Sequence, residues 1–156
     1  MEPLIVLVAV TALLTVAGRP PALALRYGLA AMFPLTGGAH FIGLREELIA
    51  MVPPWLPAPD LLVTVTGVLE LLGAVGLVLK RTAPWAAAGL TGLLLAMFPA
   101  NVQHALSGTE LPWHDQLVPR TLMQVLFLAA TVAVVVLEVR SRRAVGAAQG
   151  APAVVS

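Results

Sequence analysis

LLVTVTGVLELLGAVGLVL, from Leu61 to Leu79, is an apolar stretch with one charged residue, Glu70, near its middle. Its length matches the roughly 20 residues that a helix needs to cross a bilayer. A carboxylate at the centre of a spanning helix costs about 2.5–3.5 kcal/mol on insertion scales. We therefore expect Glu70 to face the inside of a helical bundle, where a partner, a proton or a wet cavity offsets that cost.

Four further apolar segments surround this stretch. They are Leu4–Ala17, Leu23–Ile42, Ala83–Ala105 and Thr121–Val139. The last three are long enough to span a membrane, whereas the first needs all of residues 1–18 to do so. Its start, MEPLI, has no Lys or Arg and so lacks the basic region of a signal peptide. We predict an all-α, multi-pass membrane bundle in which residues 1–18 are retained as a helix.

The composition supports a membrane protein and excludes several other classes. Only 11% of the residues are charged and the mean hydropathy is +0.93, whereas a soluble domain has about 25% charged residues. The net charge of +1 argues against nucleic acid as a partner. The chain has no cysteine, so it offers no disulfide and no thiolate ligand. The three histidines lack the spacing of a metal motif, and we predict no metal site.

The basic residues predict the orientation in the membrane. Of the nine Lys and Arg residues, only Arg45 and Arg120 fall in loops on the side of the N-terminus. The other seven fall on the opposite side, which indicates a cell-membrane protein with its N-terminus outside and its C-terminus cytoplasmic. Residues 141–156 are rich in small residues and lack apolar periodicity, so we expect a disordered cytoplasmic tail.

Small residues predict which helix faces pack together, because they let backbones approach closely in lipid. Gly67, Glu70 and Ala74 share one face of the third segment. The fourth segment repeats small residues at every fourth position, at Ala88, Gly92, Ala96 and Ala100. We interpret both faces as internal seams of the bundle.

Polar residues gather near the outer end of the predicted bundle. Beside Glu70, about 15 Å below Asp60 at 1.5 Å per residue, they are His40, Asn101, Gln103, Arg120 and Gln124. We interpret Glu70 and His40 as candidate catalytic groups that exchange protons with a ligand. Asn101, Gln103, Gln124 and Arg120 are candidate ligand-binding residues. Pro99 should also free a carbonyl near Leu95 for another partner.

Each of these residues also has a purely structural interpretation. Glu70 could fix the register of the helices, and His40 could simply meet water at a helix end. Asn101 and Gln103 could satisfy carbonyls freed by Pro99. Arg120 could anchor a helix to lipid headgroups or pair with an acid or an anionic ligand. The sequence leaves these alternatives open.

Four stretches together resemble the DoxX-like family of small membrane proteins. They are GGAHFIG (37–43), MVPPWLPAPDLLVTVTGVLELLGAVGLVL (51–79), AAAGLTGLLLAMFPANVQHAL (86–106) and RTLMQVLFLAA (120–130). The resemblance covers about Leu23 to Leu137. It implies a four-helix membrane bundle over residues 19–140, preceded by the additional helix. The family's characteristic polar positions would fall on His40, Glu70, Asn101 and Gln124.

Two functional hypotheses follow. In the first, the protein binds a quinone-like or other lipophilic molecule and supports a membrane redox system as a subunit or scaffold. This rests on the polar cluster, on the missing cysteines and on relatives associated with quinone-linked thiosulfate oxidation. It implies a quinone as the candidate cofactor and a membrane or peripheral oxidoreductase as partner, and it leaves a homodimer open. In the second, the protein is a membrane-embedded acid/base enzyme, an isomerase or cyclase, that acts on an apolar substrate through Glu70.

Overall fold

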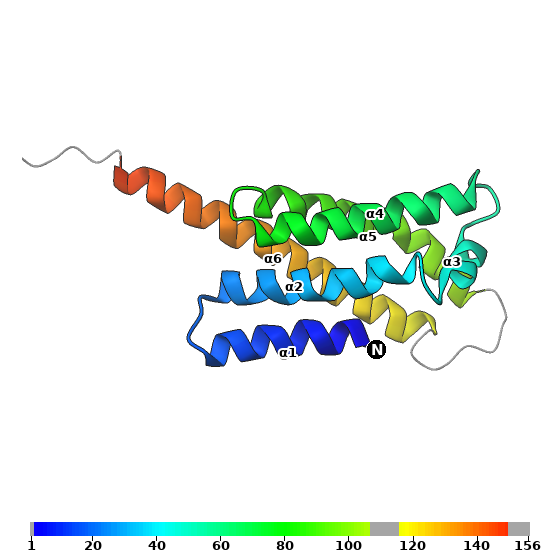
Figure 1. Cartoon of the computed structure of the whole chain (residues 1–156), viewed down its shortest axis with the longest axis horizontal. Helices are drawn as coiled ribbons and strands as arrows, with labels where there is room; N and C mark the ends of the chain where they lie inside the picture. Colours follow the sequence, from blue (N-terminus) through cyan, green and yellow to red (C-terminus); the bar gives the residue numbers. More distant parts are fainter. Residues whose placement is uncertain (1, 107–115, 150–156) are drawn as a thin grey trace, which may run out of the picture.

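The computed structural model describes residues 2–106 and 116–149, and within these ranges it contains helices and no strand (Figure 1). The helices are α1 (Glu2–Val16), α2 (Pro21–Ala39), α3 (Arg45–Met51), α4 (Pro59–Val78), α5 (Ala83–Ala105) and α6 (Leu117–Gln149). The prediction of an all-α fold is confirmed for the described residues.

The long helices lie side by side and form a bundle, which Figure 1 shows along its length. α2 packs against α1, α4 and α6, and α5 packs against α4 and α6. The short helix α3 lies across one end of the bundle, against α4 and α5. This end also contains the start of α1 and the end of α2, so it brings together segments that are distant in sequence (Figure 1).

Three of the helices are long and apolar enough to cross a membrane: α4, α5 and residues 117–145 of α6. The sequence predicted five spans, and by length and composition α1 and α2 are not among these three. α1 is apolar but has only 15 residues. α2 contains Arg26 and Pro34 among its 19 residues.

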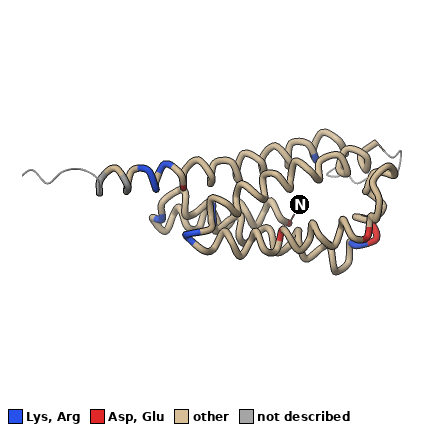
Figure 2. Tube along the Cα trace, turned by 90° about the horizontal axis from the view of Figure 1, so that it is seen from above, with Lys and Arg blue, Asp and Glu red and all other residues tan. Residues whose placement is uncertain are grey.

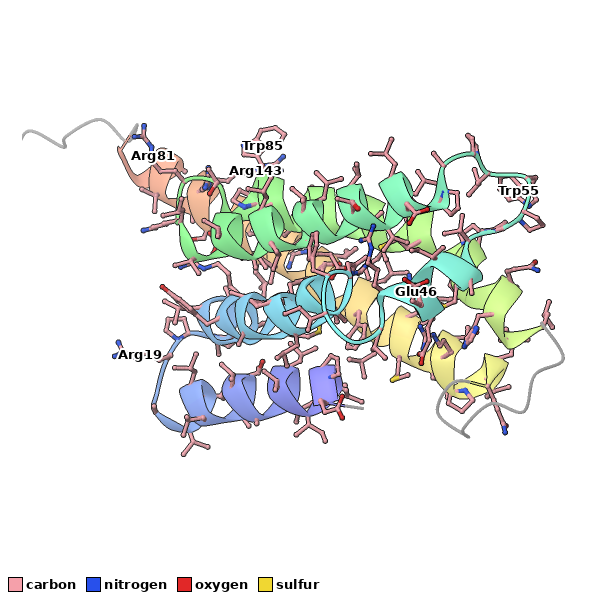
Figure 3. The ribbon with its side chains drawn as sticks, turned by 45° about the vertical axis from the view of Figure 1, so that its right-hand side comes forward. Arg19, Glu46, Trp55, Arg81, Trp85 and Arg143 are labelled. Atoms are coloured by element: carbon pink, nitrogen blue, oxygen red, sulfur yellow. The ribbon has the colours of Figure 1, made fainter. Side chains whose placement is uncertain are left out.

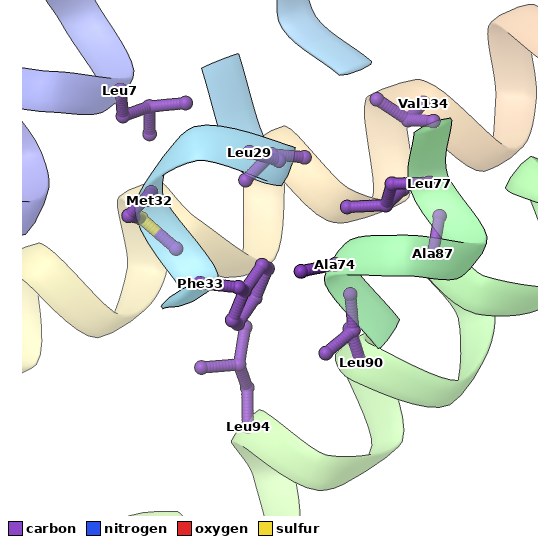
Figure 4. Packing of buried hydrophobic residues seen from close by; sticks show 10 residues of the cluster. All are labelled: Leu7, Leu29, Met32, Phe33, Ala74, Leu77, Ala87, Leu90, Leu94 and Val134. Carbon is purple, nitrogen blue, oxygen red and sulfur yellow. The ribbon is translucent and has the colours of Figure 1, made fainter. Parts of the chain in front are cut away.

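The core lies where α2, α4, α5 and α6 meet (Figure 4). Leu29, Met32 and Phe33 of α2 are almost completely buried there. They contact a layer formed by the other helices, with Ala74, Leu77, Ala87, Leu90, Leu94 and Val134. Leu7 of α1 packs against the same cluster. Because α2 supplies the centre, the other helices are arranged around it.

Two glycines allow α2 and α4 to approach each other closely. A Cβ added to Gly67 of α4 would meet the Cβ of His40 at 2.5 Å. A Cβ added to Gly37 of α2 would meet the Cβ of Glu70 at 3.1 Å. Each glycine therefore makes room for a polar residue of the other helix. The prediction that Gly67, Glu70 and Ala74 face inward is confirmed, since all three are buried.

The prediction of an internal seam along α5 is wrong. Ala88, Gly92 and Ala96 are exposed, and nothing lies within 4 Å of a Cβ added at Gly92. The opposite face of α5 packs inward, because Leu90 fills the space that Gly73 of α4 leaves open. A large side chain facing a glycine on the neighbouring helix therefore forms the seam between α4 and α5.

The two ends of the bundle differ in charge (Figures 2 and 3). We call one the basic end, with Arg19, Lys80, Arg81, Arg140, Arg142 and Arg143, and the other the acidic end, where Glu46, Glu47 and Asp60 outnumber Arg45. At the basic end, Arg142 donates hydrogen bonds to the carbonyls of Lys80 and Arg81 at 2.6 and 2.9 Å. α6 continues through residues 141–149, where the sequence predicted a disordered tail. Residues 150–156 of that tail lie outside the described residues.

Candidate functional site

A cavity of about 670 Å³ lies near the acidic end of the bundle. It is bounded by the start of α1, the end of α2, α3, the middle of α4, the end of α5 and the first turns of α6. Its volume falls within the range of small-molecule sites, about 300–1,000 Å³. Five of the six predicted site residues line it: His40, Glu70, Asn101, Arg120 and Gln124.

Glu70 lies in the wall that α4 contributes to the cavity. The residue is only 3% exposed, and Gly37 of α2 packs directly against its Cβ. Its Oε2 atom is buried and has no hydrogen-bond partner among the described residues. Buried carboxylate oxygens normally accept hydrogen bonds, because an unsatisfied one costs free energy. Glu70 therefore retains an acceptor position that a molecule in the cavity can use.

His40 follows the last residue of α2 and is also 3% exposed. Its Nδ1 lies 2.9 Å from the backbone carbonyl oxygen of Thr36. A carbonyl only accepts hydrogen bonds, so Nδ1 donates, and in the neutral ring Nε2 is then an acceptor. The burial of His40 does not fit the interpretation that it simply meets water at a helix end.

Arg120 and Asn101 bind each other across the ends of α5 and α6. The Nε and Nη2 atoms of Arg120 donate to Oδ1 of Asn101 at 3.2 and 3.0 Å. This pair positions the guanidinium in the cavity wall. The amide oxygen of Asn101 thus accepts two hydrogen bonds from Arg120. These hydrogen bonds hold α5 and α6 together at the cavity.

Gln124 joins the same two helices one turn further along α6. Its Nε2 donates to the backbone carbonyl of Leu94 at 2.6 Å, and the residue is buried. The sequence predicted a free carbonyl near Leu95 because of Pro99. The carbonyl that receives the side-chain hydrogen bond is one residue earlier. Gln124 therefore both lines the cavity and stabilises the helix pair.

Gln103 is the one predicted site residue that the structure does not bring to the cavity. Gln103 is exposed and does not line the cavity. Successive helical residues are about 100° apart, so two positions beyond Asn101 the side chain points to the opposite side of α5. His104, which comes three positions after Asn101 and shares its face, lines the cavity instead.

Thr36, Glu2 and Glu47 also line the cavity, and they are not among the residues predicted from the sequence. Thr36 could have been predicted from the sequence, because it lies four residues before His40 and therefore on the same face of α2. Glu2 and Glu47 could not have been predicted in this way, because α1 and α3 reach the cavity only through tertiary packing.

The rest of the wall is apolar and adaptable. Met97 of α5 and Met123 and Phe127 of α6 form one side of it, and methionine side chains adjust easily to the shape of a ligand. Among the described residues, no group of three His, Asp or Glu side chains could hold a metal ion. The arrangement is therefore suited to an organic molecule with an apolar body and a polar group that forms hydrogen bonds.

A family model described as Domain of unknown function (DUF8561) matches residues 29–135, which is more than half of the chain. The matched range contains all five predicted residues that line the cavity. A search of the curated proteins and a search of the solved structures each found no match.

Proposed function

We propose that this chain, which belongs to the family described as Domain of unknown function (DUF8561), is a small integral membrane protein that binds a lipophilic molecule with a polar head, such as a quinone. The observation that carries the proposal is the unpartnered Oε2 of Glu70 in a cavity that is otherwise largely apolar. An ionisable residue within a membrane span indicates a functional site.

The placement in the membrane is part of the same proposal. The exposed side chains of Trp55 and Trp85 lie towards opposite ends of the bundle, at the depths where aromatic residues meet the headgroups (Figure 3). The concentration of Lys and Arg at the basic end supports a cytoplasmic location for this end. The acidic end, with the cavity, then faces outward, and α2, α4, α5 and α6 correspond to a DoxX-like four-helix bundle.

A supporting role in a redox system follows from the chemistry of the chain. Without cysteine, the protein offers no thiol to carry electrons. A bound quinone would supply two-electron chemistry, and the hydroxyl groups of its reduced quinol form would donate hydrogen bonds to Oε2 of Glu70 and Nε2 of His40. An oxidoreductase in or on the membrane is the partner that such a subunit would need.

Extraction of the bound molecule tests this proposal. The protein is purified in mild detergent, extracted with organic solvent, and the extract is analysed by mass spectrometry. We expect a lipophile at near-stoichiometric amount, and its amount should fall at least about tenfold in Glu70→Gln. Hydrogen bonds to charged groups contribute about 1.5–3 kcal/mol, and 1.4 kcal/mol is tenfold in affinity.

Two further variants make the test specific. Glu46→Gln removes a carboxylate at the same end that does not line the cavity, and it should retain the lipophile. Met123→Trp fills the cavity without changing a charge, and it should lose the lipophile. Wild-type protein without an enriched lipophile would refute the proposal, as would equal retention in Glu70→Gln and Glu46→Gln.

An acid/base enzyme is the second candidate function. The same unpartnered Oε2 favours it, because a general acid or base must reach its substrate directly. In this case an apolar substrate would be isomerised or cyclised in the cavity. Turnover of a candidate substrate that persists in Glu70→Gln would exclude this role for Glu70.

A further inference from the structure

A second hollow lies outside the core, at the other end of the bundle from the cavity. This groove has a volume of about 610 Å³ and lies between α1, α2 and the end of α4. Its walls are mostly aliphatic, with Leu13, Leu14, Leu23 and Ala30 among the lining residues. Among the described residues, Arg19 is the only charged one that lines it, and Tyr27 is the only aromatic one. The groove is thus apolar along its length and positively charged at one end.

The backbone fixes Arg19 at the end of the groove. Gly18 has a φ of +74°, which glycine adopts without strain. The amide of Arg19 donates to the carbonyl of Leu14 at 2.9 Å, and the amide of Gly18 donates to that of Thr15 at 3.0 Å. These two bonds form a Schellman motif that ends α1. Because α2 begins at Pro21, the turn is short and holds Arg19 at the groove.

Tyr27 forms the second polar feature of the groove. Its ring lies 5.3 Å from the guanidinium carbon of the buried Arg26, which restricts its position. Tyrosine is enriched where a membrane meets water, since it has an apolar body and a polar tip. A molecule in this groove would therefore meet a hydroxyl and a cation at the level of the headgroups.

The surroundings of the groove carry a strong positive charge. Arg19, Lys80, Arg81, Arg140, Arg142 and Arg143 are all exposed at the basic end. The only described acid near them is Glu138, which is buried and paired with Arg26 at 3.0 Å. Clusters of Lys and Arg beside membrane helices attract anionic lipids. The charge of this end thus complements an anionic headgroup, and the groove complements a hydrocarbon chain.

We propose that the groove between α1, α2 and α4 binds an anionic phospholipid, with one acyl chain along the aliphatic wall and the phosphate at Arg19. This inference rests on the placement of the chain in a membrane, and it is independent of the ligand in the cavity at the acidic end. The lipid would fix α1, the shortest of the apolar helices, to the rest of the bundle.

Native mass spectrometry of the whole protein tests this site. The protein is reconstituted in vesicles of equal parts phosphatidylglycerol and phosphatidylcholine, extracted in mild detergent, and its bound lipids are counted. We expect one retained phosphatidylglycerol and no phosphatidylcholine. Arg19→Gln should lower the retained phosphatidylglycerol about fivefold, which is the typical effect of one basic residue near a membrane surface.

Control variants distinguish lipid binding in the groove from general attraction of lipids to the positively charged surface. Arg143→Gln removes an exposed cation at the same end that does not line the groove, and it should retain phosphatidylglycerol at the wild-type level. Ala31→Trp fills the groove without changing the charge, and it should lose the lipid. Glu70→Gln should have no effect, which distinguishes this site from the cavity.

Three outcomes would overturn the inference. Equal losses in Arg19→Gln and Arg143→Gln would indicate only general attraction to an anionic surface. Equal retention of the two lipids would exclude a role for the net negative charge of the headgroup, because both lipids carry a phosphate. A lipid-free dimer in the same spectra would assign the groove to a second copy of the chain.

Discussion

Two buried carboxyl groups of this protein have opposite environments. Glu138 of α6 accepts a hydrogen bond from Arg26 of α2 at 3.0 Å, with both side chains nearly inaccessible. Glu70 of α4 has an oxygen without a partner among the described residues, and it lines a cavity. The first carboxyl is already used to join two helices. The second is available to a bound molecule, and this contrast is the reason to propose a functional role for Glu70 and a structural role for Glu138.

The pair formed by Arg26 and Glu138 yields a stability prediction. Arg26→Met removes the cation and leaves the carboxyl of Glu138 buried and unpaired. Breaking a buried pair from one side typically costs about 3–5 kcal/mol. We expect a loss of this size in the free energy of unfolding, measured by denaturant titration in detergent micelles.

Two controls belong to this prediction. The double variant Arg26→Met/Glu138→Leu should recover most of the loss, because no buried charge remains. Arg140→Met changes an exposed arginine at the same end and should stay within about 0.5 kcal/mol of wild type. A double variant that is less stable than Arg26→Met would contradict this account.

At the scale of helices, the crossing of α2 and α4 depends on two glycines that face His40 and Glu70. Gly67→Ala would place a methyl group 2.5 Å from the Cβ of His40. A Cβ cannot swing aside as the end of a flexible chain can, so the helices must separate. We predict a lower unfolding temperature and reduced retention of the lipophile proposed for the cavity.

Gly92→Ala is the matched control for this prediction. Nothing lies within 4 Å of an added Cβ at Gly92, and alanine favours a helix over glycine by about 1 kcal/mol. This variant should therefore be as stable as wild type or more stable. Both glycines lie within helices, and both variants can be compared by thermal unfolding in the same detergent. Equal effects of the two substitutions would show that the crossing of α2 and α4 is not tight at Gly67.

The sequence predicted the helices and part of the site, and the errors have a common physical cause. The apolar segments and the inward face of Glu70 were readable, because apolar length and small-residue spacing are local features. The exposure of the small-residue face of α5 could not be predicted. Small residues at every fourth position indicate a close approach only when a neighbouring helix is present. Likewise, Glu2 and Glu47 enter the cavity through tertiary packing, which no local pattern records.

At the scale of the whole molecule, the two hollows lie towards opposite ends and differ in charge. The cavity near the acidic end is lined by Glu2, Glu47 and Glu70 together with one cation, Arg120, whereas the groove at the basic end is lined by Arg19. A bilayer is itself asymmetric, with anionic lipids in the cytoplasmic leaflet. In the proposed membrane placement, the orientation of the bundle therefore decides which leaflet each hollow can sample.

The orientation can be measured directly because the chain has no cysteine of its own. A single cysteine introduced by Glu46→Cys lies at the acidic end, and one introduced by Arg143→Cys lies at the basic end (Figure 3). Both positions are exposed. Because basic residues remain on the cytoplasmic side, we expect a membrane-impermeant maleimide to label Glu46→Cys in intact cells. Arg143→Cys should be labelled only after the membrane is permeabilised. The reverse pattern would place the cavity on the cytoplasmic side, and labelling of both positions in intact cells would contradict a fixed transmembrane orientation.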